Sequence, residues 1–147
     1  MKRYQLFYLI TILILISCAD RSEPITINRT KKGGLYEINE DGKEFTFYNR
    51  NEKLKIDTSN AISFKNFEKL YSENAPMDGL AVLVIKLDES GTSKLSTMTK
   101  RNMNKQLCLV IEDNIVSAPQ VSEPIVNGEL ELLMTKKDFD FLKNSFE

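Results

Sequence analysis

Two continuous apolar runs dominate the second half of the chain, at residues 80–85 and 107–111. Neither run alternates with polar residues, and such runs are typical of strands that are covered on both faces. The segment between them, residues 89–103, repeats apolar side chains at helical spacing. These side chains are Leu95, Met98 and Met103. The pattern therefore predicts two buried strands joined by an amphipathic helix.

Shorter alternating segments precede these runs. Residues 35–38 and 44–48 alternate on either side of Asp41-Gly42, a turn-forming pair, and this spacing predicts a β-hairpin. Further short alternating pieces follow between residues 54 and 64. Residues 64–71 carry apolar side chains at helical spacing in a short segment, so both a helix and a strand remain open for them.

The last part of the chain predicts a strand and a closing helix. Residues 129–132 alternate between glutamate and leucine, which points the leucines inward. Thr135 is placed to cap a helix, with Asp138 three residues later. The apolar stripe of that helix is Phe139, Leu142 and Phe146. We expect an α+β fold, a small mixed or antiparallel sheet packed against two helices, with a β-hairpin region at its N-terminal side.

The N-terminus has the pattern of a targeting segment. Lys2 and Arg3 precede an apolar run of about eleven residues, which is too short to cross a ~30 Å hydrocarbon core comfortably. The run ends in Leu15-Ile16-Ser17-Cys18, which resembles the lipobox of bacterial lipoproteins. We expect a signal peptide at residues 1–17, lipidation of Cys18 and a location in the bacterial cell envelope, on the inner or the outer membrane. A transmembrane anchor, or a secretion signal with a chance cysteine, is the alternative.

The next segment, residues 18–34, is polar and contains Pro24 and Gly33-Gly34. This composition favours a flexible tether with a root-mean-square span of roughly 20–25 Å. The folded domain is then expected at residues 35–147.

Composition argues against several functions. The formal charge is −1 and the basic residues do not cluster beyond pairs, so a nucleic-acid partner is not expected. The chain has no histidine, which removes the usual general base and the commonest neutral metal ligand. Ser117 therefore cannot belong to a Ser-His-Asp triad, and Cys108 lies in an apolar run where a thiol behaves as a small hydrophobe. Glu112-Asp113-Asn114 lacks the spacing of a calcium loop and favours a hairpin turn. We expect no enzyme, metal or cofactor.

The segment that is most suggestive of binding is Glu123, Pro124, Ile125, Val126, Asn127 and Gly128. A proline and two hydrophobic residues suggest an exposed loop, and loops on rigid scaffolds often carry binding functions. The alternative is that Ile125 only fills the core beneath the loop.

Several spaced landmarks resemble a known family. They are residues 87–91, 95–103 and 106–114, Val116-Ser117-Ala118-Pro119, and the spaced Glu123, Ile125 and Gly128. They are similar to the head subdomain of the first periplasmic loop of SecD, a subunit of the SecDF protein-export machine. The resemblance covers residues 80–146. Asn104, Cys108 and Met134 depart from the usual pattern, and Asn104 keeps a residue that tolerates the left-handed conformation.

The resemblance implies a head domain without the proton-driven motor of SecD, and a surface that contacts unfolded polypeptide. We therefore expect a lipid-anchored envelope protein that binds a protein or peptide partner and serves as an export or envelope accessory. A lipoprotein that binds a small ligand or the cell wall on the same scaffold is the alternative.

Overall fold

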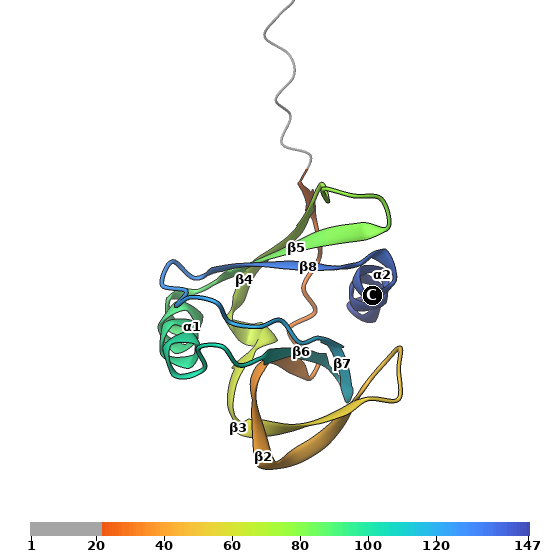
Figure 1. Cartoon of the computed structure of the whole chain (residues 1–147). Coiled ribbons are helices and arrows are strands. Elements are labelled where there is room, and N and C mark those ends of the chain that lie inside the picture. Colours follow the sequence, from red (N-terminus) through yellow and green to blue (C-terminus); the bar gives the residue numbers. More distant parts are fainter. Residues whose placement is uncertain (1–21) are drawn as a thin grey trace, which may run out of the picture.

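The computed structural model describes residues 22–147, so the predicted signal peptide and Cys18 lie outside the described residues. The described chain forms two four-stranded sheets and two α-helices (Figure 1). In chain order the elements are β1 Glu23–Pro24, β2 Gly33–Phe47, β3 Lys53–Ser63, a 3-10 turn Phe64–Asn66, β4 Phe67–Glu73, β5 Leu80–Leu87, α1 Glu89–Arg101, β6 Leu107–Ile111, β7 Asn114–Ser117, β8 Glu129–Thr135 and α2 Lys136–Ser145. The expected α+β class is confirmed.

The first sheet is antiparallel and has the order β1-β4-β5-β8. Its inner face is apolar because β8 alternates as the sequence predicts and every second side chain of β5 points to the same side. The inward side chains of these two strands are Ala81, Leu83, Ile85, Leu87, Leu130, Leu132 and Met134, all buried in the main core. The outer face of β5 is less covered than predicted, since Val82 and Lys86 are half-buried.

The second sheet has the order β3-β2-β6-β7 and curls back on itself. Residues 33–37 of β2 pair with β6, whereas Thr46 and Phe47 pair in parallel with β7. The curled sheet encloses a second, smaller core that includes Cys108 and Ile115. Strand β6 is buried on both faces, as predicted, because alternate side chains point into the two cores.

The predicted hairpin turn at Asp41-Gly42 is wrong in its position. Ile38 and Lys43 both align with Ile56 of β3, so residues 39–42 form a bulge within one long strand. A Cβ atom at Gly42 would collide with the backbone of Ile56, which explains the glycine. The hairpin connects β2 to β3 through residues 48–52.

The two apolar runs do not share a sheet. Strand β5 belongs to the first sheet and β6 to the second, and the two face each other across the main core. The helix between them is confirmed. Asp88 caps it by accepting a 2.7 Å hydrogen bond from the Gly91 amide. Helix α1 ends at Arg101, two residues earlier than predicted.

Two predicted end signals are confirmed. Asn104 adopts a left-handed φ of 63° just after α1. Thr135 caps α2 by accepting a 3.1 Å hydrogen bond from the Asp138 amide, and Phe139, Leu142 and Phe146 are buried. The open segment 64–71 is resolved as a 3-10 turn followed by β4.

The prediction that the tether continues to Gly34 is wrong for the described part of it. Strand β1 pairs with β4, and the Ile25 amide donates a 2.8 Å hydrogen bond to the Leu70 carbonyl. Ile25 is buried in the main core, and Gly33 and Gly34 begin β2. The polar composition of this segment did not predict the pairing. One buried isoleucine and a few backbone hydrogen bonds hold the segment on the edge of the sheet.

Candidate partner-binding surface

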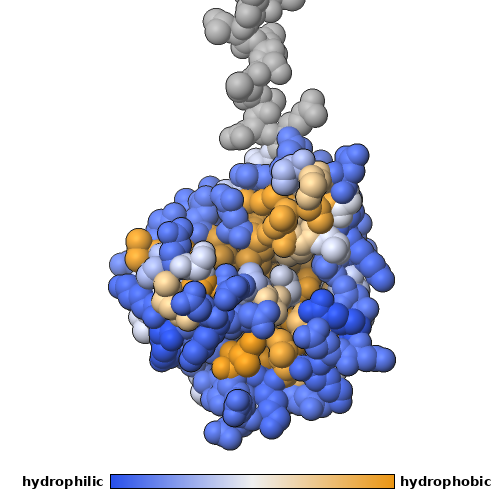
Figure 2. All heavy atoms as spheres, viewed as in Figure 1, coloured by the Kyte–Doolittle hydropathy of each residue, from blue (hydrophilic) through white to orange (hydrophobic). Residues whose placement is uncertain are grey.

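A groove of about 300 Å³ lies between β8 and the segment 119–127, which we call the β8 groove. Its floor is apolar and contains the buried side chains Leu35, Leu107, Val121, Leu130 and Leu132. Polar side chains, including Glu123, Glu129 and Glu131, line its rim. Figure 2 shows apolar surface on this face of the molecule, in a hollow framed by polar residues.

One side of the β8 groove is the free edge of a strand. Within residues 22–147, β8 pairs with β5 alone and ends the first sheet. A strand at the edge of a sheet presents a row of backbone N–H and C=O groups that can pair with another chain. The β8 groove therefore combines an apolar floor with unpaired main-chain groups.

The structure places the predicted loop residues 123–128 in two groups. Ile125 is half-buried against the main core, and its amide donates a 3.0 Å hydrogen bond to the Thr99 hydroxyl of α1. Gly128 is buried and has a φ of +73°, and a Cβ atom there would collide with Thr92 of α1. Val126, by contrast, is 64% exposed. Ile125 and Gly128 thus attach the loop to α1, and Val126 is presented to solvent.

Two residues of the sequence landmark 95–103, Thr99 and Asn102, have structural roles in and beside α1. Thr99 is buried and donates a 2.8 Å hydrogen bond to the Leu95 carbonyl while it accepts from Ile125. Asn102 donates a 2.8 Å hydrogen bond to the Met98 carbonyl and another to Glu37 of β2. Thr99 therefore holds the loop 123–128, which we call the groove loop, and Asn102 holds the curled sheet.

Sequence reasoning missed Glu37. This residue is 6% exposed, and its carboxylate accepts hydrogen bonds from Arg101, Asn102 and, at 3.2 Å, Asn60. The ion pair with Glu37 raises the pKa of the Arg101 guanidinium. Glu37 lies in a segment where polar residues alternate with apolar ones, a pattern that predicts an exposed side chain. Only its hydrogen-bond partners, which are far along the chain, show that it is buried.

The remaining candidate residues do not form a reaction centre. Cys108 is fully buried, and burial raises the pKa of its thiol to about 12, so it is not a reactive thiolate. Ser117 is the last residue of β7 and has no histidine to activate it. Glu112 and Asp113 form the turn between β6 and β7, with Glu112 at a φ of 56°, and Asn114 begins β7. In the described part of the chain, no group of three or more acidic or cysteine side chains is arranged to hold a metal ion.

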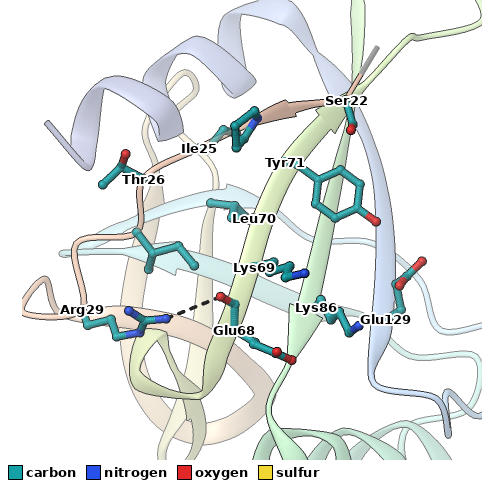
Figure 3. A pocket seen from close by; sticks show the side chains of 12 residues that line it. Ser22, Ile25, Thr26, Arg29, Glu68, Lys69, Leu70, Tyr71, Lys86 and Glu129 are labelled. Atoms are coloured by element: carbon teal, nitrogen blue, oxygen red, sulfur yellow. Dashed lines mark hydrogen bonds between the residues drawn. The ribbon is translucent and has the colours of Figure 1, made fainter. Parts of the chain in front are cut away.

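A second hollow, of about 630 Å³, lies between the segment 22–29 and β4 (Figure 3). Charged side chains of both signs line it together with apolar ones, and Arg29 donates a 3.0 Å hydrogen bond to the Phe67 carbonyl at the start of β4. Lys69, Lys86 and Glu129 lie in adjacent positions across three strands, beside Tyr71. The lining of this hollow is less apolar than that of the β8 groove, and it contains both positive and negative side chains.

None of the helices in residues 22–147 is long and apolar enough to cross a membrane. Fold and site together define a small two-sheet α+β domain with an open strand edge beside an apolar groove. The chain belongs to the family described as SecDF, P1 head subdomain, which matches residues 42–137. The match begins well before Leu80, where the resemblance seen in the sequence starts, so it includes most of the curled sheet.

Relatives agree with this assignment. The protein translocase subunit SecD of Acidaminococcus fermentans is 30% identical over 63 residues, which cover 43% of this chain and 15% of the relative. The SecD subunit of Calditerrivibrio nitroreducens is 38% identical over 48 residues, 33% of this chain and 9% of the relative. The chain thus spans only a small part of the length of these relatives.

A solved structure of SecDF, described as a membrane component that enhances protein export, has the same fold. It superposes with a TM-score of 0.56 at 12% identity and covers 79% of this chain and 60% of the solved chain.

Proposed function

We propose that this protein is a lipid-anchored module of the cell envelope that binds a protein or peptide partner, without catalysis of its own, as an accessory of protein export or of the envelope. Family membership supports the link to export, because the relatives are translocase subunits. The observation that carries the proposal is the open edge of β8 beside an apolar groove.

The chemistry of the β8 groove suits an extended polypeptide. A segment laid against the edge of β8 forms main-chain hydrogen bonds, which do not depend on its sequence. Leu107, Leu130 and Leu132 offer apolar contact to alternate side chains of the segment. This combination fits a partner that is unfolded or has an exposed strand. Val126 is exposed between the groove-lining residues Ile125 and Asn127, so a probe at Val126 lies beside the groove.

The anchor in this proposal is Cys18. Cleavage before Cys18 and acylation of its thiol keep the domain at a membrane, since each buried CH₂ contributes about 0.8 kcal/mol. The sequence Leu15-Ile16-Ser17-Cys18 supports this step.

The alternative function is the binding of a small ligand or of cell-wall material. The hollow between the segment 22–29 and β4 favours it, because Lys69, Lys86 and Glu129 there are close to the aromatic ring of Tyr71. Charged groups beside an aromatic ring are suited to a polar ligand such as a sugar or a peptide end.

Photo-cross-linking in intact cells tests the two functions. A photoreactive side chain at Val126 is expected to give protein adducts, whereas the same group at Met77 is not. Met77 is the matched control because it is also 64% exposed but lies at the opposite end of the first sheet. Equal yields at the two positions, or no protein adduct at Val126, contradict the proposal. Retention of the protein on cell-wall material that is lost in Lys86→Ala supports the alternative.

A further inference from the structure

The connection between β4 and β5, residues 74–79, ends in an exposed apolar tip. Met77 is 64% exposed, and Pro76 beside it is exposed as well. The tip is a tight turn in which the Leu80 amide bonds to the Met77 carbonyl and Gly79 has a φ of +80°. Met77 and Pro76 therefore form a small apolar surface on this turn, which no side chain of residues 22–147 buries.

The register of the first sheet places this tip where the described chain begins. Strand β1 is antiparallel to β4, and Glu23 pairs with Ser72. Ser22 therefore lies toward Glu73 and the turn that follows it. Ser22, Glu23, Asn74 and Ala75 line one shared hollow, which confirms this closeness. Figure 1 shows the start of β1 and the connection between β4 and β5 at the same end of the molecule.

The length of chain between Cys18 and Glu23 limits how far the tip can lie from the lipid. Five residues span at most about 18 Å, whatever their conformation. A domain of this size has a radius of gyration of about 14 Å. The docking of β1 thus shortens the tether from residues 18–34, which composition suggested, to a length comparable with the radius of the domain.

We propose that the tip formed by residues 74–79 rests on the lipid surface, with Met77 and Pro76 in the headgroup region. The inference rests on the proposed acylation of Cys18, which supplies a high effective concentration of the tip at the membrane. A single methionine cannot hold a protein on a membrane alone, but it is sufficient to orient a domain that is already tethered beside it.

The charges around the tip indicate which part of the membrane it contacts. Glu23, Glu73 and Asp78 are acidic, while Lys136 and Lys137 begin α2, where the Lys136 amide bonds to the Gly79 carbonyl. The acidic groups outnumber the lysines, and Lys136 is paired with Asp140, so the contact is apolar and does not depend on attraction to anionic headgroups.

This orientation has a consequence for the β8 groove. Strand β8 runs from Glu129, opposite Lys86, to Thr135, opposite Leu80 at the tip. Eight residues of β5 span about 26 Å, so Val126 and the far end of the groove stand away from the lipid. The membrane contact therefore presents the groove to a partner in the aqueous compartment.

Site-directed spin labelling of the mature lipidated protein in phosphatidylethanolamine–phosphatidylglycerol vesicles tests this inference. The variants are Met77→Cys and Val126→Cys, which place the label at two sites of equal exposure. Cys108 is fully buried and does not take up label in the folded protein. The ratio of oxygen to nickel-chelate collision rates rises when a label enters a bilayer, and it is measured after flotation of the vesicles.

We expect the collision ratio at position 77 to be several-fold higher than at position 126, at low and at high salt alike. Equal ratios in protein that floats with the vesicles overturn the inference and leave the anchor intact. Protein that is left behind by the floating vesicles overturns the anchor and this inference with it. A ratio at position 77 that falls to the value at position 126 in high salt overturns the apolar contact.

Discussion

The Ile125 amide and the Thr99 hydroxyl are joined by a 3.0 Å hydrogen bond that attaches the loop 123–128 to the last turn of α1. Thr99 is fully buried, and its hydroxyl hydrogen is donated to the Leu95 carbonyl, so its oxygen is free to accept from the loop. The loop is therefore positioned by a helix that also supports the curled sheet through Asn102 and Glu37. The shape of the β8 groove depends on this helix.

Replacement of Thr99 by valine tests the attachment. Valine keeps the shape and the β-branched backbone preference but leaves the Ile125 amide without an acceptor. We expect a loss of about 1–2 kcal/mol in the free energy of unfolding and faster hydrogen exchange at the Ile125 amide. Thr97→Val is the matched control, because Thr97 bonds to the Ser93 carbonyl at 3.2 Å on the exposed side of the same helix. Equal effects of the two variants contradict the role of Thr99.

Gly128→Ala tests the packing of the loop against Thr92. Two costs add here, the left-handed φ of +73° and the collision of the new Cβ with Thr92. Gly79→Ala isolates the first cost, since Gly79 has a φ of +80° and no atom within 4 Å of its Cβ position. Chemical denaturation is expected to give about 1 kcal/mol of destabilisation for Gly79→Ala and about 2–4 kcal/mol for Gly128→Ala. A similar loss of stability in both variants would show that the loop shifts to accommodate the new Cβ, and it would contradict tight packing against Thr92.

Glu37→Ala tests the buried carboxylate. The substitution leaves the Asn102 and Arg101 donors without their acceptor, and we expect a loss of about 2–3 kcal/mol in urea unfolding. Glu44 lies on the same strand and forms an exposed ion pair with Lys53 at 2.7 Å. Glu44→Ala should leave the unfolding midpoint nearly unchanged. If the two variants unfold alike, Glu37 is not the connection between α1 and the second sheet.

Cys108 predicts an alkaline loss of stability. Burial raises the pKa of its thiol to about 12 in the folded state, so the folded protein holds a proton that the unfolded chain releases. The contribution is complete below the pKa of the unfolded thiol, near 9, and is lost as the pH rises toward 12. We expect the free energy of unfolding to fall more steeply with pH than in Cys108→Ala, with the extra slope approaching about 1.4 kcal/mol per pH unit between pH 10 and 11. Parallel curves for the two proteins exclude this contribution; Tyr36 and Tyr48 are common to both.

Cys18→Ser tests the anchor. The variant has no thiol to acylate, so we expect it to leave the membrane fraction or to accumulate as the unprocessed precursor. Fractionation of cells followed by mass measurement of the protein distinguishes these results. Mature protein that stays in the membrane fraction contradicts lipidation at Cys18.

Local sequence patterns predicted an element correctly where its structure depends on residues that are close together in the chain. Strand β5 begins at the predicted Leu80 and continues two residues past the apolar run. Helix α1 starts at the predicted residue 89, where Asp88 accepts a hydrogen bond from an amide only three residues away. Asn104 and Thr135 behave as predicted for the same reason, since each acts within one turn of its own position. The family landmarks in this region also identified the correct relatives.

Other features depend on distant partners. Asp41-Gly42 has the composition of a turn, yet it forms a bulge because β3 continues to pair with β2 on both sides of it. The segment 23–29 is as polar as a linker, yet Ile25 docks it on β4. Glu37 resembles a solvent-facing glutamate until α1 brings Arg101 and Asn102 against it.

The sequence by itself determined the α+β class and the positions of the central strands and helices, because these follow from periodicity and short-range capping. It also determined the family, through its spaced landmarks. Only the tertiary structure decided that the two apolar runs belong to different sheets, that β8 has a free edge beside a groove, and that the chain returns to the sheet at Glu23. Strand order and docking are settled by contacts between residues far apart in the chain, and a one-dimensional pattern of polar and apolar residues does not specify which strand lies beside which.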